Sequence, residues 1–462
     1  MAGSFCHETR QPGQSAQRGA ASMSHSPSPA AAGRPWYLAT LGGLASYLDS
    51  GVLFATALSI SLWQGQFGLS AWSVGAITAA LTVSIGIGSL VGGHVGDRFG
   101  RKRVYSADLI VFAFGLLWLI FAANEPMLYV GVVLTGLAAG ADLPASLALV
   151  GESAPAAKRG RMVSYAQLMW GLGIIVVQVV AKLTAFSGTL MPRILFGQLL
   201  LVALVTWALR QRLPESEVWV AERERRNGKK DRSWALLMRR PILGGLAFTT
   251  AFYLLSTVMT QFFGNFGPYA MISLFHFDLP TVTSIMVMIG PVGLVCGIVF
   301  MRLVDHRTAR TAMFAVGAVV QLAGLLLLVV LPLDATVFVI CFMVVIAGAS
   351  FAGEGNYKVW SQEIFPTSLR GTAQGISFGI ARIGAAAFTV VSPTLLHNDP
   401  KIVLTILLVA TTVAMGLGFL FQPRDSGRTI EQIDAAFAPG PMERHSAGEA
   451  TREHPTTAEQ TT

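Results

Sequence analysis

The stretch ESAPAAKRG at residues 152–160 recurs as EIFPTSLRG at residues 363–371, with glutamate, proline, arginine and glycine at the same spacing. The two copies lie nearly half of the 462-residue chain apart. Each copy follows one long apolar run and precedes another, as in a chain that crosses a membrane repeatedly. The repeat therefore indicates two related helix bundles, an arrangement typical of transporters that bind their substrate between the halves.

Composition supports the membrane location. Hydrophobic residues make up 53% of the chain and charged residues 13%, whereas about a quarter of the residues in a soluble domain are charged. Apolar stretches long enough to cross about 30 Å of hydrocarbon are centred near residues 50, 84, 114, 139, 172, 203, 252, 291, 321, 346, 382 and 412. We predict an all-α membrane protein with twelve transmembrane helices in two pseudo-symmetric six-helix bundles.

These helices divide the chain into five parts. The bundles are predicted over residues 35–212 and 241–422, and a charged cytoplasmic linker over 213–240 joins them. Residues 1–34 are rich in Ser, Pro, Ala and Gly, and residues 423–462 are mostly polar. We therefore expect both ends to be cytoplasmic tails, the first of them disordered.

The distribution of Lys and Arg predicts the orientation, because cytoplasmic loops carry most of the positive charge. Only Lys182, Arg193 and Lys401, of 33 Lys and Arg residues, fall in the expected outer loops. The formal charge of +8 thus reflects topology and implies no nucleic-acid partner. We expect a multi-pass protein of the cell membrane whose partners are lipid, protons and a small molecule.

The turn between the second and third predicted helices reads GHVGDRFGRK at residues 93–102. It resembles the signature loop of the major facilitator superfamily. Asp97 can accept hydrogen bonds from a helix N-terminus, while Arg98 and Arg101 can pair with carboxylates. The second half carries a shortened copy, DHRTAR at residues 305–310, without the glycine. The first loop is thus the better candidate for a latch between conformations.

Four further stretches resemble the sugar porter family within that superfamily. In chain order they are GGLASYLDSGV at 42–52, RGRMVSYAQ at 159–167, PESEVW at 214–219 and PRDSGRTIE at 423–431. The resemblance implies that Gln167 and a Q-x-x-G-x-N run on the seventh helix bind sugar hydroxyls. That run appears here as Gln261 and Asn265, with the asparagine one residue early.

Asp49 lies midway along the first predicted helix, where an unpaired charge is costly. The sugar porter resemblance implies that it carries the coupled proton. Proton-coupled members pair this aspartate with an arginine on the fourth helix, but Val132 stands there. The fourth helix instead carries GADLP at residues 140–144, which resembles the GGDYP of phosphate and organic-ion symporters. Asp142 is therefore a second proton-coupling candidate.

Two basic residues are predicted inside the membrane. Arg382 stands where the organic-ion relatives place a basic residue, and Lys358 stands where sugar porters have a sugar-stacking tryptophan. Glu354 precedes Lys358 by four residues, so the two can pair on one helix face. If Glu354 neutralises Lys358 and Arg382 compensates an aspartate, the substrate can be neutral. If Lys358 or Arg382 is free, the substrate is an anion such as a sugar acid or aromatic acid.

A cytoplasmic gate is predicted at the repeated motif. The acids Glu152 and Glu363 end the fourth and tenth helices, where they can reach arginines of adjoining loops. The gate residues are Asp97, Arg98, Arg101, Glu152, Arg159, Glu215, Glu363 and Arg370.

We expect the protein to be a secondary active transporter that takes up a small polar metabolite with protons by alternating access. A monosaccharide or polyol such as an inositol fits the sugar porter motifs, and an organic anion is the alternative. No phosphate-binding GxxxxGK[ST] loop is present, so the proton gradient is the expected energy source and no cofactor is expected. A membrane enzyme or a sensor is disfavoured, since the eight histidines are scattered and no metal site is expected.

Overall fold

The structure, a computed structural model, describes residues 35–211, 220 and 237–423. The predicted tails and nearly all of the linker, including Glu215, lie outside these residues. Every regular element in the described part is helical, which confirms the predicted fold class.

The described residues of the first half form six long helices. They are α1 (Pro35–Phe67), α2 (Ala71–Phe99), α3 (Arg101–Ile120), α4 (Glu125–Ser153), α5 (Arg159–Thr184) and α6 (Leu190–Arg210). Two single turns, η2 (Ala156–Lys158) and η3 (Ala185–Ser187), lie before and after α5.

The second half repeats this plan with two interruptions. Its elements are α9 (Arg240–Gln261), η4 (Phe262–Phe266), α10 (Gly267–Phe275), α11 (Leu279–Leu303), α12 (Arg307–Val330), α13 (Ala335–Ala352), α14 (Glu354–Ile364), α15 (Arg370–Asn398) and α16 (Pro400–Phe421). A π-helical turn, η4, joins α9 to α10, while α13 and α14 are separated only at Gly353. Each pair forms one crossing, so this half also crosses six times.

Local sequence explains where several helices begin. Ser70, Asn124 and Asp334 cap α2, α4 and α13 by accepting hydrogen bonds from backbone N–H groups three residues on, as N-cap side chains commonly do. Gly100 joins α2 directly to α3 with a φ of 104°, a conformation that residues with a Cβ rarely adopt. The glycine of the signature loop therefore allows this sharp turn.

Among the described residues, ten helical segments are long and apolar enough to span a membrane. The apolar part of α3, Val104–Ile120, is shorter. All twelve predicted helix centres fall inside long helices. A helix that spans the membrane must be apolar along its length, so a continuous apolar run identifies it.

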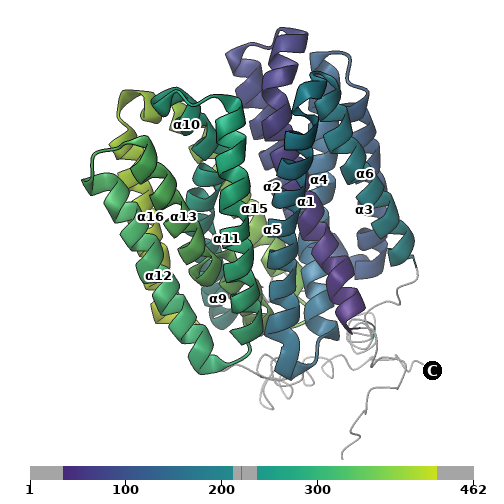
Figure 1. The fold of residues 1–462 in the computed structure, drawn as a ribbon. Helices are drawn as coiled ribbons and strands as arrows, with labels where there is room; N and C mark the ends of the chain where they lie inside the picture. The colour runs from purple at the N-terminus through teal and green to yellow at the C-terminus, as the bar shows by residue number, and fades with distance from the viewer. Residues whose placement is uncertain (1–34, 212–219, 221–236, 424–462) are drawn as a thin grey trace, which may run out of the picture.

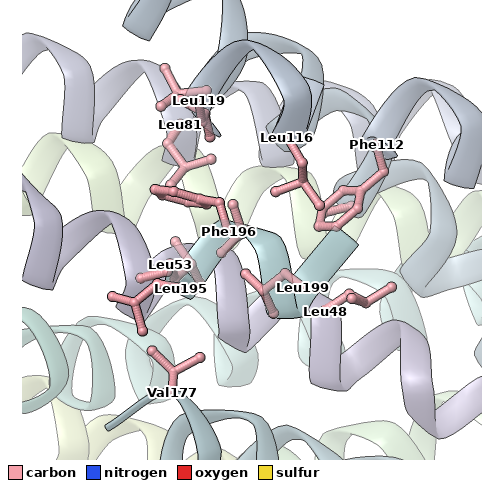
Figure 2. Packing of buried hydrophobic residues seen from close by; sticks show 14 of the residues in the cluster. Leu48, Leu53, Leu81, Phe112, Leu116, Leu119, Val177, Leu195, Phe196 and Leu199 are labelled. Carbon is pink, nitrogen blue, oxygen red and sulfur yellow. The ribbon is translucent and has the colours of Figure 1, made fainter. Parts of the chain in front are cut away.

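The two halves stand side by side in Figure 1, with α5 of the first half beside α11 of the second. In the first half, leucine, valine and phenylalanine side chains from α1, α2, α3, α5 and α6 form one buried cluster (Figure 2). Within it, the rings of Trp63 and Phe196 are stacked with centroids 5.6 Å apart. The first half therefore has a hydrophobic core of its own.

Glycines allow α2 and α15 to pack closely across the boundary between the halves. A Cβ at Gly86 would lie 3.1 Å from the Gly379 backbone oxygen, and one at Gly375 would collide with the backbone oxygen of Ser89. These contacts run from the middle of both helices to the end of the molecule that carries residues 93–102. We call this end of the molecule the α2–α3 end. The two halves are closed against each other there.

Candidate functional site

Asp49 of α1 and Arg382 of α15 form an ion pair between the two halves. The guanidinium Nη2 lies 2.8 Å from Asp49 Oδ2, and the exposed fractions of the two side chains are 0% and 2%. Trp170 of α5 donates its indole N–H to the same oxygen at 3.1 Å. Gly86 of α2 lies beside this part of α15, since a Cβ there would lie 2.9 Å from Ile383 Cγ1 and 3.1 Å from the Gly379 backbone oxygen.

Lys358 of α14 is the centre of a second polar group. Its Nζ lies 3.0 Å from Glu354 Oε1 and donates a hydrogen bond of 2.6 Å to Gln167 Oε1 of α5. The Lys358 side chain is 0% exposed, whereas that of Glu354 is 16% exposed. This group also joins the halves, because Gln167 lies in the first and Lys358 in the second.

The interruption at Gly353 positions Glu354. Because α14 begins there, Glu354 lies in its first turn, where the helix dipole stabilises a carboxylate. Asn356 donates its amide to the Phe351 backbone oxygen at 2.7 Å and satisfies a carbonyl near the broken end of α13. The break thus places a charged pair inside a spanning segment at reduced electrostatic cost.

The predicted amides of the seventh helix lie at the π-helical turn. Gln261 ends α9, is 7% exposed, and its Nε2 has no hydrogen-bond partner in the described part of the chain. Asn265 lies in η4, but its side chain is outside the described residues. The π-helical turn changes the angular spacing, so α-helical geometry does not predict the direction of Asn265.

Asp142 lies in a third buried group, formed within the first half. Arg210 Nη2 of α6 lies 2.9 Å from Asp142 Oδ2, and its Nη1 lies 3.8 Å from Asp108 Oδ1 of α3. The guanidinium carbon also lies 3.4 Å from the centroid of the Tyr105 ring. Asp108 and Arg210 are absent from the sequence-based predictions, although Asp108 stands out as a charge within an apolar run.

The α2–α3 end carries two matching contacts between carboxylates and helix N-termini. Asp97 Oδ2 accepts from the backbone N–H of Thr372 at 2.6 Å and from its hydroxyl at 2.9 Å. Asp305 Oδ1 accepts from the backbone N–H of Arg161 at 3.0 Å. Thr372 and Arg161 are each the third residue of their helix.

These contacts connect the two repeated sequence features. Each helix starts with the Arg-Gly of the repeat, and Cβ atoms at Gly160 and Gly371 would lie 2.6 and 2.7 Å from the carboxylate oxygens. The glycines therefore admit the carboxylates. The shortened loop at residues 305–310 makes the same contact as the signature loop at residues 93–102. The sequence favoured the first loop as the latch because the second lacks the glycine. The contact requires the aspartate, which both loops have.

Asp305 is partly shielded from water at this end. Burial raises the pKa of its carboxyl group above the ordinary value of 3.8, while the backbone N–H groups of Arg161 and Gly160 and the charge of Arg161 act in the opposite direction. Arg161 Nε lies 3.7 Å from Asp305 Oδ2. The carboxyl group of Asp305 therefore binds a proton more readily in this closed arrangement than it would in water.

The remaining predicted gate residues make several different contacts. Glu152 Oε1 lies 3.7 Å from Arg370 Nη1 across the halves, whereas Glu363 Oε1 lies 2.8 Å from Arg310 Nη1 within the second half. Gln362 adds a hydrogen bond of 3.2 Å from α14 to the Leu147 backbone oxygen of α4.

The structure brings only some of the predicted arginines into this network. Arg159 is buried at the start of α5. Arg98 is exposed, lies 5.2 Å from the centroid of the Phe99 ring, and forms no ion pair with another described residue. The Arg101 side chain lies outside the described residues, as does Glu215.

Comparisons with known proteins agree with this architecture. A family model described as Major Facilitator Superfamily matches residues 39–389. The chain is 32% identical over 426 residues to the minor myo-inositol transporter IolF of Bacillus subtilis, covering 88% of this chain and 94% of that protein. It is 24% identical over 434 residues to the glucose transporter GlcP of Staphylococcus epidermidis, covering 86% and 95%.

Solved structures show the same fold. The proton:xylose symporter XylE bound to 6-bromo-6-deoxy-D-glucose superposes with a TM-score of 0.73. The superposition covers 87% of this chain and 98% of that chain at 19% sequence identity.

Proposed function

Because the chain belongs to the major facilitator superfamily, we propose that it is a proton-coupled transporter for uptake of a neutral, polyhydroxylated metabolite. A monosaccharide or an inositol-like polyol is the proposed substrate. It binds between the halves near Gln167 and Gln261, and alternating access carries it across the membrane.

The observation that carries this proposal is the charge balance between the halves. Arg382 is paired with Asp49, and Lys358 is paired with Glu354. Binding an organic anion favours a cation without a carboxylate partner, and neither base meets that condition. The balance therefore favours a neutral substrate over the sugar-acid or aromatic-acid alternative.

The relatives support the same substrate class. The names of IolF and GlcP specify myo-inositol and glucose, and XylE is described as a proton:xylose symporter. All three ligands are neutral rings bearing several hydroxyl groups. Amides suit such ligands because each provides both donors and acceptors.

Asp49 is the proposed proton carrier because its partner lies in the other half. Protonation removes the attraction to Arg382 and thereby favours separation of the halves. Among the described residues, the ion-pair partner of Asp142 is Arg210 of its own half, so rocking of the halves preserves that ion pair. Asp142 shares Arg210 with Asp108 inside the first half, so it is the weaker candidate for the proton carrier.

The α2–α3 end is the proposed cytoplasmic gate. Its loops carry most of the positive charge, which favours the cytoplasmic side. Its contacts, including those of Asp97, Asp305 and Glu152, hold the halves together there. In this proposal they break when the substrate is released inward, and both termini are cytoplasmic.

Uptake assays test the function directly. Cells expressing the protein are given labelled myo-inositol, glucose, xylose, a hexuronate and an aromatic acid, with and without a protonophore. We expect uptake of at least one neutral ring compound and its loss with protonophore. Uptake of the acids alone would contradict the substrate assignment, while protonophore-resistant accumulation would contradict proton coupling.

A further inference from the structure

We infer that Lys358 positions two substrate-binding groups, presenting the Gln167 amide nitrogen as a donor and the Glu354 carboxylate as an acceptor for neighbouring hydroxyls. Lys358 itself does not contact the substrate. This inference rests on the proposed function and specifies how the site selects neutral polyols over anions.

The orientation of Gln167 follows from the chemistry of its partner. An ammonium group has donors and no acceptor, so the amide atom that lies 2.6 Å from Lys358 Nζ has to be the oxygen. The NH₂ group then points away from Lys358. Gln167 is partly exposed, and its amide nitrogen has no hydrogen-bond partner among the described residues. It is thus available as a donor.

Glu354 supplies the complementary acceptor. One carboxylate oxygen, Oε1, binds Lys358, and the side chain remains 16% exposed. The second oxygen has no hydrogen-bond partner in the described part of the chain. This second oxygen is therefore available to accept a hydrogen bond from a hydroxyl group.

The two groups are close enough to act on one ligand. Both are in contact with the same Nζ atom, at 2.6 and 3.0 Å, so the Gln167 and Glu354 oxygens are separated by no more than the sum of these distances. A vicinal diol can accept from the amide through one hydroxyl and donate to the carboxylate through the other. An anionic ligand would face the carboxylate without a free cation nearby.

Lys358 is poorly placed to touch a ligand. Its side chain is 0% exposed and its ammonium is held by the two groups that it orients. The contact with Gln167 crosses the halves, whereas the contact with Glu354 stays within α14. Separation of the halves would therefore release the amide and weaken binding of the diol, giving the substrate different affinities for the two conformations.

The first test uses Gln167, where the side-chain shape can be kept. Gln167→Glu retains a partner for Lys358 but removes the amide donor, and Gln167→Leu removes both. With purified protein and a neutral ring compound that the wild type carries, we expect both variants to bind about tenfold more weakly or worse, as for loss of one buried hydrogen bond. Wild-type affinity in Gln167→Glu would overturn the inference.

The second test separates positioning from simple charge compensation. Lys358→Met should lower affinity about tenfold, and the double variant Glu354→Gln/Lys358→Met should remain impaired, since its Gln167 is unoriented. Full recovery in the double variant would show that Lys358 only neutralises Glu354 and would overturn the inference. Lys401→Met, at an exposed lysine, is the matched control, and thermal unfolding checks that each variant is folded.

Specificity gives a readout that general destabilisation would not produce. In the wild type, deoxy analogues lacking one hydroxyl of a vicinal pair should bind about tenfold less well than the parent ring. In Gln167→Leu, the analogue and the parent ring should bind almost equally well. Equal discrimination in both proteins would contradict the inference while leaving the proposed transport function intact. Absence of binding of any neutral ring compound by the wild type would instead defeat the proposed function itself.

Discussion

Single residues connect protonation to the motion of the halves, and Asp49 is the main case. Asp49→Asn leaves Arg382 as an uncompensated buried charge, a change that costs about 3–5 kcal/mol in buried ion pairs. We expect loss of proton-driven accumulation, whereas counterflow exchange without a gradient should be better preserved. Uptake and counterflow are measured over a range of pH in vesicles.

An exposed aspartate provides the control for this change. Asp278 precedes α11 without a side-chain cap, so Asp278→Asn should leave both assays unchanged. Accumulation by Asp49→Asn that still followed the proton gradient would rule out Asp49 as the coupling carboxylate.

Asp305 predicts a pH dependence at the α2–α3 end. Burial raises its pKa above 3.8 in the closed arrangement, and opening to water would return the pKa toward that value. The closed state thus binds the proton more tightly, so closure is favoured as pH falls through the raised pKa toward 3.8. Distances between spin labels at Lys158→Cys and Arg307→Cys should shorten on average as pH falls.

The Asp305→Asn variant isolates this contribution from other titrating groups. Its asparagine can still accept from the Arg161 N–H but does not titrate in this range. We expect a weaker dependence of the label distance on pH. An unchanged dependence would assign the effect to other residues.

Sequence reasoning found some of the buried charges and missed others. Asp49 and Arg382 were identified individually because charges are rare in spanning helices. Their pairing depends on how α1 and α15 face each other in the fold, which a single amino-acid sequence does not specify. Arg210 is not predicted as a site residue, because it ends a predicted helix next to the basic linker, where positive charge is typical of cytoplasmic loops.

Among the helices, the packing of α2 against α15 makes the sharpest prediction. The Cβ of Gly375→Ala would collide with the Ser89 backbone, and overpacking costs about 1–3 kcal/mol. This penalty applies to the closed arrangement, so the population should shift toward opening at the α2–α3 end. The same pair of spin labels should report longer distances.

Gly197→Ala on α6 is the matched substitution, since its Cβ would meet nothing within 4 Å. We expect wild-type distances for this control. Equal distances in both variants would show that the close approach of α2 and α15 does not determine the conformation.

The hydrophobic pattern predicts where the helices cross the membrane but not where a helix is interrupted. Apolar runs located all twelve crossings, since burial in lipid acts on each residue locally. The break at Gly353 and the π-helical turn over Phe262–Phe266 were predicted as continuous helix. Both are changes of backbone hydrogen bonding that leave the apolar run intact, so hydropathy does not reveal them.

At the scale of the whole molecule, the proposed orientation can be tested by labelling. Phe186 is 98% exposed in the turn between α5 and α6, while Arg98 lies at the opposite, α2–α3 end. A membrane-impermeant maleimide applied to intact cells should label Phe186→Cys and should label Arg98→Cys only after permeabilisation. The native cysteines are replaced first, and the reverse pattern would contradict the proposed topology.

The paired contacts of Asp97 and Asp305 restrict how the two halves can move. A single attachment would leave the halves free to pivot about it in several directions. Two attachments, one from each half and reversed by the pseudo-symmetry, also resist twisting and sliding. Releasing one aspartate should therefore change mainly the direction in which the halves move. Releasing both should also change how far they move, so single and double variants of Asp97 and Asp305 should show different kinds of motion.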